Sequence, residues 1–89
     1  MRQASFGARS LRLTPSEFHL LRYLVERQGR VVGRQELLIR VWGYRYAGRE
    51  RSVDTHVLNL RAKLAHLGPR LESVRGLGYK LARAGGAAR

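Results

Sequence analysis

The chain has 89 residues, and its 18 lysine and arginine residues outnumber six acidic residues to give a formal net charge of +12. This length predicts one small domain, for which 44% hydrophobic residues are enough to form a core. The lack of cysteine excludes disulfides, thiol catalysis and cysteine-ligated zinc, and no apolar run approaches the roughly 18 residues of a membrane span. The charge favours an acidic partner, such as nucleic acid, an anionic membrane or an acidic protein.

The N-terminal segment predicts a short hairpin. Residues 2–13 contain two short runs with apolar points, and Gly7-Ala8 lies between them. The first ten residues lack the apolar core of a signal peptide, so a cytoplasmic location is expected.

Residues 14–28 predict the first helix. Thr14 suits the N-cap, Pro15 suits the first helical position, and Glu17 completes a capping box. Gly29 follows the last turn, where a left-handed cap is favoured. The apolar stripe is expected to contain Phe18, Leu21, Leu24 and Val25.

A second helix is predicted over residues 34–42, with Gly33 before it and Gly43 just past its end. Its apolar residues are Leu37, Leu38, Val41 and Trp42. The preceding run, "RVV", is long enough for only one rung of sheet. Residues 43–51 follow the helix and form a loop rich in arginine and tyrosine.

Residues 52–67 predict the third helix, with Ser52 as its N-cap and Gly68-Pro69 as its stop. Hydrophobic residues recur at helical spacing and fall within about 80° of each other on a helical wheel. They are Val53, Val57, Leu60, Leu64 and Leu67. One face of this helix is therefore expected to be buried.

Residues 71–82 predict a second hairpin around the turn Gly76-Leu77-Gly78. The domain is expected to cover residues 1–83, and residues 84–89 are expected to be a disordered tail. The order of elements predicts an α+β fold, a winged helix-turn-helix with three helices, an N-terminal hairpin and a C-terminal hairpin as the wing.

The exposed face of the third helix carries short, mostly uncharged side chains. Thr55, Asn59, Ala62 and His66 lie opposite the apolar stripe, Leu58 lies at the edge of that face, Arg61 and Lys63 flank it, and His56 lies beside Lys63. Short side chains let a helix approach base edges in a major groove, and cations at the rims reach the phosphates. The alternative, a polar surface with accidental gaps, is equally compatible with this helix alone.

The second hairpin carries Arg75 beside its Gly-x-Gly turn. A guanidinium on a thin loop suits a narrow minor groove. Tyr79 offers a phosphate contact, although a half-buried strand tyrosine is the stronger interpretation, and Trp42 is assigned to the core.

Four segments of the chain resemble OmpR/PhoB-type response-regulator effector domains. They are "LTPSEFHLLRYL", "RQELLIRVWG", "RSVDTHVLNLRAKL" and "SVRGLGYKL", in the order found in that family, and the resemblance runs from about Arg2 to Ala82. It implies a cytoplasmic bacterial transcription regulator of a two-component phosphorelay that binds double-stranded DNA sequence-specifically. A receiver domain normally precedes this domain.

The resemblance also implies residue roles. Thr55, Leu58 and Asn59 align with base-facing positions, Arg51, His56 and Arg61 align with DNA-backbone contacts, and Arg75 aligns with the minor-groove wing residue. Ser52, Lys63 and Tyr79 are further backbone candidates. The loop residues Tyr44, Arg45, Tyr46 and Arg49 align with a segment that touches RNA polymerase in several members. A solvated basic loop that touches phosphate is an equally good interpretation of this segment.

Three features depart from the family pattern. Only the last hairpin of a usual four-stranded N-terminal sheet is expected, and no receiver domain is present, so the chain resembles a fragment. Gly33 replaces the usual Ser or Thr cap, which costs a few tenths of a kcal/mol. Leu58 stands where some members have arginine, so the target sequence does not transfer.

Non-specific nucleic-acid binding, architectural or RNA-directed, is the main alternative because charge alone permits it. The six acids form no catalytic constellation, and the three histidines lack metal-ligand spacing, so we expect no enzyme, metal site or cofactor. Membrane binding is disfavoured because no helix joins a basic face to an exposed apolar face. The isolated domain is expected to be a monomer that pairs on tandem DNA half-sites.

Overall fold

The computed structural model describes residues 2–6, 9–46, 48–65 and 70–82, and the expected tail at 84–89 and the stop at Gly68-Pro69 lie outside these ranges. The elements in chain order are β1 (Arg2–Phe6), β2 (Arg9–Leu13), α1 (Pro15–Glu26), α2 (Arg34–Leu37), a π-helix η1 (Leu38–Trp42), a 3-10 helix η2 (Tyr44–Tyr46), α3 (Glu50–Leu64), β3 (Arg70–Val74) and β4 (Gly78–Ala82). β1 pairs with β2 and β3 with β4, each pair antiparallel. The predicted winged helix-turn-helix architecture is confirmed.

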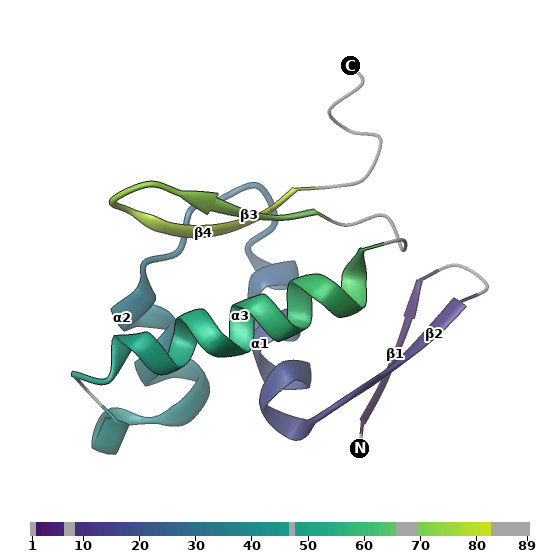
Figure 1. Ribbon diagram of the computed structural model, residues 1–89, viewed down its shortest axis with the longest axis horizontal. Coiled ribbons are helices and arrows are strands. Elements are labelled where there is room, and N and C mark those ends of the chain that lie inside the picture. Colours follow the sequence, from purple (N-terminus) through teal and green to yellow (C-terminus); the bar gives the residue numbers. More distant parts are fainter. Residues whose placement is uncertain (1, 7–8, 47, 66–69, 83–89) are drawn as a thin grey trace.

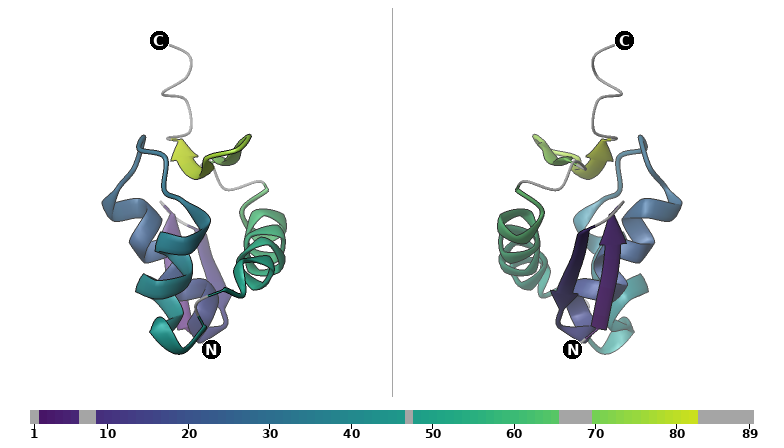
Figure 2. Two further views of the ribbon diagram at one scale, coloured as in Figure 1. Left: turned by 90° about the vertical axis from the view of Figure 1, so that its left-hand side faces the viewer. Right: turned by 90° about the vertical axis from the view of Figure 1, so that its right-hand side faces the viewer.

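The third helix, α3, contacts α1, α2 and the strand β3. The β3–β4 hairpin, called the wing below, lies along one side of α3 (Figure 1). The β1–β2 hairpin lies beyond the C-terminal end of α3. The side views of Figure 2 show α3 on one side of the molecule and α1 with α2 on the other. One long side of α3 is therefore left uncovered.

The core is formed by leucine and valine side chains from α1, α2, η1 and α3, from both hairpins and from Val32. Its buried members are Leu13, Leu20, Leu21, Leu24, Val32, Leu37, Leu38, Val53, Val57, Leu60, Leu64, Leu71 and Leu81. The predicted stripe of the first helix is wrong at Val25, which is 45% exposed, whereas Leu20 is fully buried. Val25 lies in the last turn of α1, on the side of the helix away from buried Leu24.

The start of α1 has the predicted capping box. The Glu17 amide donates to the Thr14 hydroxyl at 3.1 Å, and the Thr14 amide donates to the Glu17 carboxylate at 3.0 Å. After the helix, Gly29 takes a φ of 86° and donates its amide to the Leu81 carbonyl at 2.9 Å. The left-handed residue thus turns the chain onto β4.

The second predicted helix is α-helical only to Leu37 and then widens into the π-helix η1. The Gly43 amide donates to the carbonyls of both Leu38 and Ile39, at 3.1 and 2.9 Å, as the chain leaves the wide turn. Trp42, at the end of η1, packs against the core and donates its indole N–H to the Ser16 hydroxyl at 3.1 Å. π-helical turns are rare and occur mostly as single turns within α-helices.

The third helix begins at Glu50, two residues before the predicted Ser52 cap. Arg49 occupies the N-cap and makes no side-chain capping hydrogen bond, while the Ser52 amide donates to the Arg49 carbonyl at 3.0 Å. The expectation is wrong because a charged side chain, Glu50, begins the first turn where the helix dipole favours it.

The wing is attached to the helices by the single rung expected from "RVV". Val32 and Tyr79 exchange two backbone hydrogen bonds of 2.8 and 2.9 Å. Gly78 has a φ of 148°, and a Cβ added there would lie 2.1 Å from the Val32 carbonyl oxygen. Glycine is therefore required at the place where the wing crosses the chain before α2.

In the described part of the chain, no helix combines the length and apolar character that crossing a membrane requires.

Candidate nucleic-acid interface

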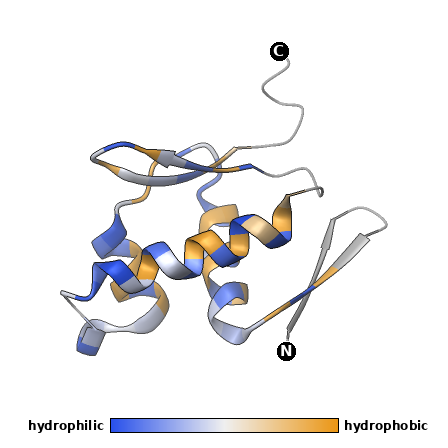
Figure 3. Cartoon of the chain, viewed as in Figure 1, coloured by the Kyte–Doolittle hydropathy of each residue, from blue (hydrophilic) through white to orange (hydrophobic). Residues whose placement is uncertain are grey.

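One face of α3 is open to solvent and carries short or flexible side chains. Its exposed residues are Arg51, Ser52, Thr55, Leu58, Asn59 and Ala62, and Leu58 is 62% exposed. No side-chain hydrogen bond or ion pair connects Thr55 or Asn59 to another residue in the described ranges. Figure 3 shows hydrophilic and hydrophobic residues alternating along α3, as expected for a helix with one buried side. We call this exposed set the free face.

Asp54 and Arg61 lie on the flank of α3 that faces the wing. The Asp54 carboxylate accepts two hydrogen bonds from Arg34, at 3.0 and 2.7 Å, and one from the Tyr79 hydroxyl at 2.6 Å. Arg61 donates to the Leu71 carbonyl and to the Ser73 hydroxyl, both at 2.9 Å. These contacts join α3 to both strands of the wing.

His56 and Lys63 lie on the opposite flank, which faces α1 and η1. The Lys63 ammonium donates to Glu17 at 2.5 Å, and the Glu17 side chain is only 6% exposed. The His56 and Trp42 rings lie 4.7 Å apart between centroids. This flank thus closes over the start of α1 and the end of η1.

The ionisation of Glu17 reflects two opposing influences. Burial alone would raise the pKa of this carboxyl, but the hydrogen bonds from Lys63 and Thr14 and the nearby ammonium charge outweigh it and lower the pKa below its ordinary value of 4.5. Glu17 is therefore ionised at neutral pH, and the capping box and the Lys63 contact depend on the same carboxylate.

The two cations predicted to reach phosphates from the rims are each bonded within the domain, Arg61 to the wing and Lys63 to Glu17. Tyr79 is half-buried and donates to Asp54, in line with its interpretation as a strand tyrosine. The helical wheel predicted the correct sides of α3 for Arg61 and Lys63. It did not predict their partners, which lie on other elements.

His56 has one ring nitrogen committed to the helix. Its Nδ1 lies 2.8 Å from the Ser52 carbonyl oxygen, which can only accept, so Nδ1 carries the proton. Nε2 is then the ring nitrogen that the helix backbone does not engage.

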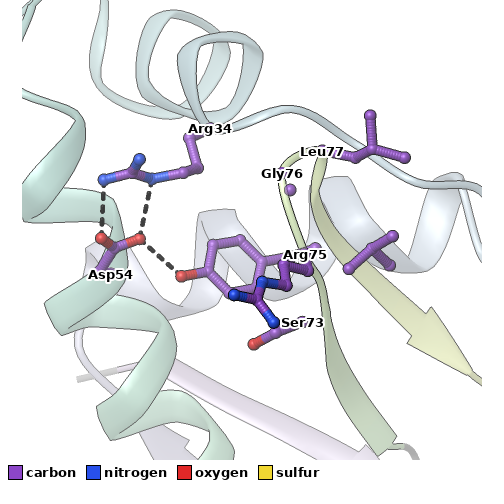
Figure 4. Close-up of a pocket in the computed structure, with 9 residues that line it drawn as sticks. Arg34, Asp54, Ser73, Arg75, Gly76 and Leu77 are labelled. Carbon is purple, nitrogen blue, oxygen red and sulfur yellow. Dashed lines mark hydrogen bonds and ion pairs between the residues drawn. The ribbon is translucent and has the colours of Figure 1, made fainter.

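The turn of the wing presents exposed residues beside the free face. Arg75 and Gly76 are exposed, and Leu77 is 65% exposed. A groove of about 410 Å³ runs between this turn and the Arg34–Asp54 pair. In Figure 4 Leu77 points away from that pair, on the far side of the turn.

The loop between η1 and α3 is strongly exposed. Tyr44 is 78% exposed and Tyr46 is 37% exposed, and Arg45 and Arg49 are exposed as well. Both tyrosines belong to the short helix η2, which contacts η1. The four residues predicted for this loop therefore share one exposed segment.

The sequence pattern did not predict roles for Arg34 and Asp54. The partner of Asp54 is Arg34, which lies twenty residues earlier in the chain. A signal was present, because Asp54 and Arg61 are seven residues apart and so share one flank of a helix. Among the residues that the structure describes, no cluster of His, Asp and Glu could hold a metal ion.

Residues 8–81 match a family described as "Transcriptional regulatory protein, C terminal". The chain is 49% identical over 80 residues to the transcriptional regulatory protein VxrB of Vibrio cholerae, covering 90% of this chain and 32% of that protein. It thus spans about a third of the length of the curated relatives it matches.

Solved structures of DNA-binding domains resemble this chain in fold. The DNA-binding domain of CpxR from E. coli has a TM-score of 0.75 and 38% identity, covering 92% of this chain and 83% of that one. The Klebsiella pneumoniae RstA DNA-binding domain, solved in complex with RstA box, has a TM-score of 0.78 and 33% identity, covering 91% and 83%. Such domains are transcription-factor modules rather than enzymes. The chain belongs to the family of OmpR/PhoB-type effector domains, the C-terminal domains of transcriptional regulatory proteins.

Proposed function

We propose that this chain is the sequence-specific, double-stranded DNA-binding domain of a cytoplasmic two-component response regulator. The observation that carries the proposal is the free face of α3, which lies between two flanks bonded to the rest of the domain. A helix held on both sides and open on its third side suits insertion into a major groove. The net charge of +12 favours the phosphate backbone as partner.

Base contacts are assigned to Thr55, Leu58 and Asn59, which are all exposed on the free face. Asn59 has both a donor and an acceptor and suits an adenine edge, while Leu58 offers only apolar contact to a thymine methyl. Relatives with arginine in place of Leu58 would then favour other target sequences.

Backbone contacts are assigned to Arg51 and Ser52 at the start of α3 and to His56. Arg61, Lys63 and Tyr79 are left out of this set because each already makes a side-chain hydrogen bond within the domain. Arg75, exposed at the wing turn, is assigned to the minor groove. Arg51→Ala should weaken all sequences equally and make the log–log salt slope shallower by about one.

The remaining partners of the proposed regulator are inferred from the family. Tyr44, Arg45, Tyr46 and Arg49 are assigned to an RNA polymerase contact, supported by their exposure on one segment. The isolated domain is proposed to be a monomer that pairs on tandem half-sites about one helical turn apart. A receiver domain is proposed to precede it in the full-length regulator.

Binding-site selection on random duplexes tests the proposal. We expect one enriched motif of roughly 6 to 10 base pairs, often in tandem, bound at least about 10³-fold more tightly than unrelated DNA at the same salt concentration. Equal affinity for all duplexes would instead indicate a non-specific basic binder.

A further inference from the structure

The wing is held to α3 by two side-chain bridges that converge on one rung of the hairpin. Asp54 binds the Tyr79 hydroxyl, and Arg61 binds the Ser73 hydroxyl. Ser73 and Tyr79 are directly paired across β3 and β4. Both strands of this rung are therefore fixed to the same helix, from points about 10 Å apart along its axis.

Asp54 is itself fixed by a second element. Arg34, the first residue of α2, donates two hydrogen bonds to the carboxylate, as Figure 4 shows. One carboxylate oxygen receives both an Arg34 N–H and the Tyr79 O–H. The direction of the carboxylate, and hence of the bond to the wing, is set by α2 and α3 together.

The Tyr79 hydroxyl is available as a donor. Burial raises the pKa of Tyr79 above its ordinary value of 10, and the hydrogen bond to Asp54 and its negative charge raise it further. The phenol therefore keeps its proton at neutral pH, as a bond to an ionised carboxylate requires.

These bridges are poorly suited to adding stability. The Arg34 and Asp54 side chains are 42% and 43% exposed, and ion pairs that exposed contribute little. The wing is already attached through buried Leu71 and Leu81 and, at Tyr79 itself, through the backbone rung with Val32. What the side-chain bridges add is a direct tie from the Ser73–Tyr79 rung to α3, and Ser73 lies two residues from Arg75.

We propose that Asp54 and Arg61 are positioning residues for DNA recognition, because they set the direction of the wing and thereby the offset between Arg75 in the minor groove and α3 in the major groove. This inference rests on the proposed function. It assigns Arg61 an internal role in place of a phosphate contact. Sequence preference at the flank of the site would then depend on residues that do not touch DNA.

A spin-label distance tests the positioning without DNA. The chain has no cysteine, so labels attach only at the two introduced sites, Leu77→Cys on the wing and Ala62→Cys on α3, both exposed. Tyr79→Phe and Arg61→Gln should each broaden or shift the distribution of distances between the two labels. Circular dichroism checks that each variant is folded. An unchanged distribution in both variants would overturn the inference whatever the domain binds.

A double-mutant cycle then tests the consequence for DNA. Dissociation constants are measured at one salt concentration on duplexes with a common core and either A·T-rich or G·C-rich flanks. In the otherwise unaltered domain, Arg75→Ala should reduce the preference for the A·T-rich flank. In a domain that also carries Tyr79→Phe, the reduction in flank preference caused by Arg75→Ala should be smaller by about threefold or more. This is the lower range of coupling between interacting residues. The loss of affinity caused by Asn59→Ala should be the same with and without Tyr79→Phe.

Tyr23→Phe is the matched control, because Tyr23 also donates its hydroxyl to a carboxylate, that of Glu36, on the side of α1 and α2. It should leave the flank preference and the Arg75→Ala effect unaltered. Additive effects of Tyr79→Phe and Arg75→Ala, or equal effects of both tyrosine variants, would overturn the positioning role. If Arg75→Ala alone leaves flank preference unchanged, the minor-groove assignment fails, and the spin-label result still decides whether the bridges hold the wing.

Discussion

Asp54 and Arg61 on one flank of α3 contact the two-stranded wing and the first residue of α2, whereas His56 and Lys63 on the opposite flank contact η1 and α1. The wing side uses partly exposed groups that bond to a carbonyl and to hydroxyls. The α1 side uses a nearly buried carboxylate, Glu17, and two packed rings. Desolvated ion pairs are costly to break and exposed ion pairs are not. We therefore expect the α1 flank to govern the stability of the domain, and the wing flank to govern the direction of the wing.

The largest effect is expected where the wing crosses the chain, at Gly78. Gly78→Ala places a methyl group 2.1 Å from the Val32 carbonyl oxygen, in a backbone conformation unsuited to alanine. We expect a loss of about 2–4 kcal/mol in the free energy of unfolding, measured with urea. Gly76→Ala is the control, since its φ is 77° but no atom lies within 4 Å of the added Cβ. Equal losses would show that steric contact with Val32 is unimportant.

Breaking the α1 flank should be the next largest effect. Lys63→Met leaves the Glu17 carboxylate nearly buried without its ammonium partner, which should cost about 1–3 kcal/mol. Lys80→Met removes a comparable pair with Glu72, but at 3.7 Å and with both side chains about a third or more exposed. It should cost under about 1 kcal/mol. Thermal unfolding of both variants decides, and a greater loss for Lys80→Met would reverse the assignment.

The free face should respond oppositely, with a change in affinity and none in stability. Asn59→Ala should cost about 1–3 kcal/mol of binding free energy on the preferred site and relax selectivity at one base pair. Leu58→Ala should cost less, because its side chain forms no hydrogen bond. Stability should change by no more than about 0.5 kcal/mol in each. A parallel loss on all sequences would remove Asn59 from the base-reading set.

The smallest expected effect is a pH dependence of the α1 flank. The folded pKa of Glu17 lies below its ordinary value of 4.5, because the Lys63 and Thr14 contacts outweigh burial. The ionised carboxylate thus contributes stability that is present above pH 4.5 and is lost as the pH falls through the folded pKa. The stability difference between the unaltered domain and Glu17→Gln should therefore shrink in acid. A difference that is constant from neutral pH to below 4.5 would contradict this.

Local sequence signals predicted the fold well where the partners are close in the chain. Thr14, Pro15 and Glu17 lie within one turn, and their capping box forms as expected. The helical spacing of Val53, Val57, Leu60 and Leu64 likewise placed the buried side of α3 correctly. The start of α3 was misplaced because Arg49 caps it without a side-chain hydrogen bond, which leaves no residue pattern to detect.

The site was only half predictable for a related reason. The exposed positions of Thr55, Leu58 and Asn59 follow from helix geometry alone. Whether a flanking cation is free depends on what another element places beside it, and Glu17 lies 46 residues from Lys63. The widening of the second helix at Leu38, where η1 packs against α1 and α3, has no counterpart in the local sequence pattern.

The Val32–Tyr79 rung has a consequence for dynamics. Its two amides are bonded only while the wing is seated, whereas the amides within α1 and α3 are bonded inside their own helices. A local opening that lifts the wing would therefore release the Val32 and Tyr79 amides to hydrogen exchange without unfolding the helices. We expect these amides to exchange faster than those in the centre of α3, and to slow on DNA binding. Their exchange rate would then measure how often the wing detaches from the helices in the folded domain.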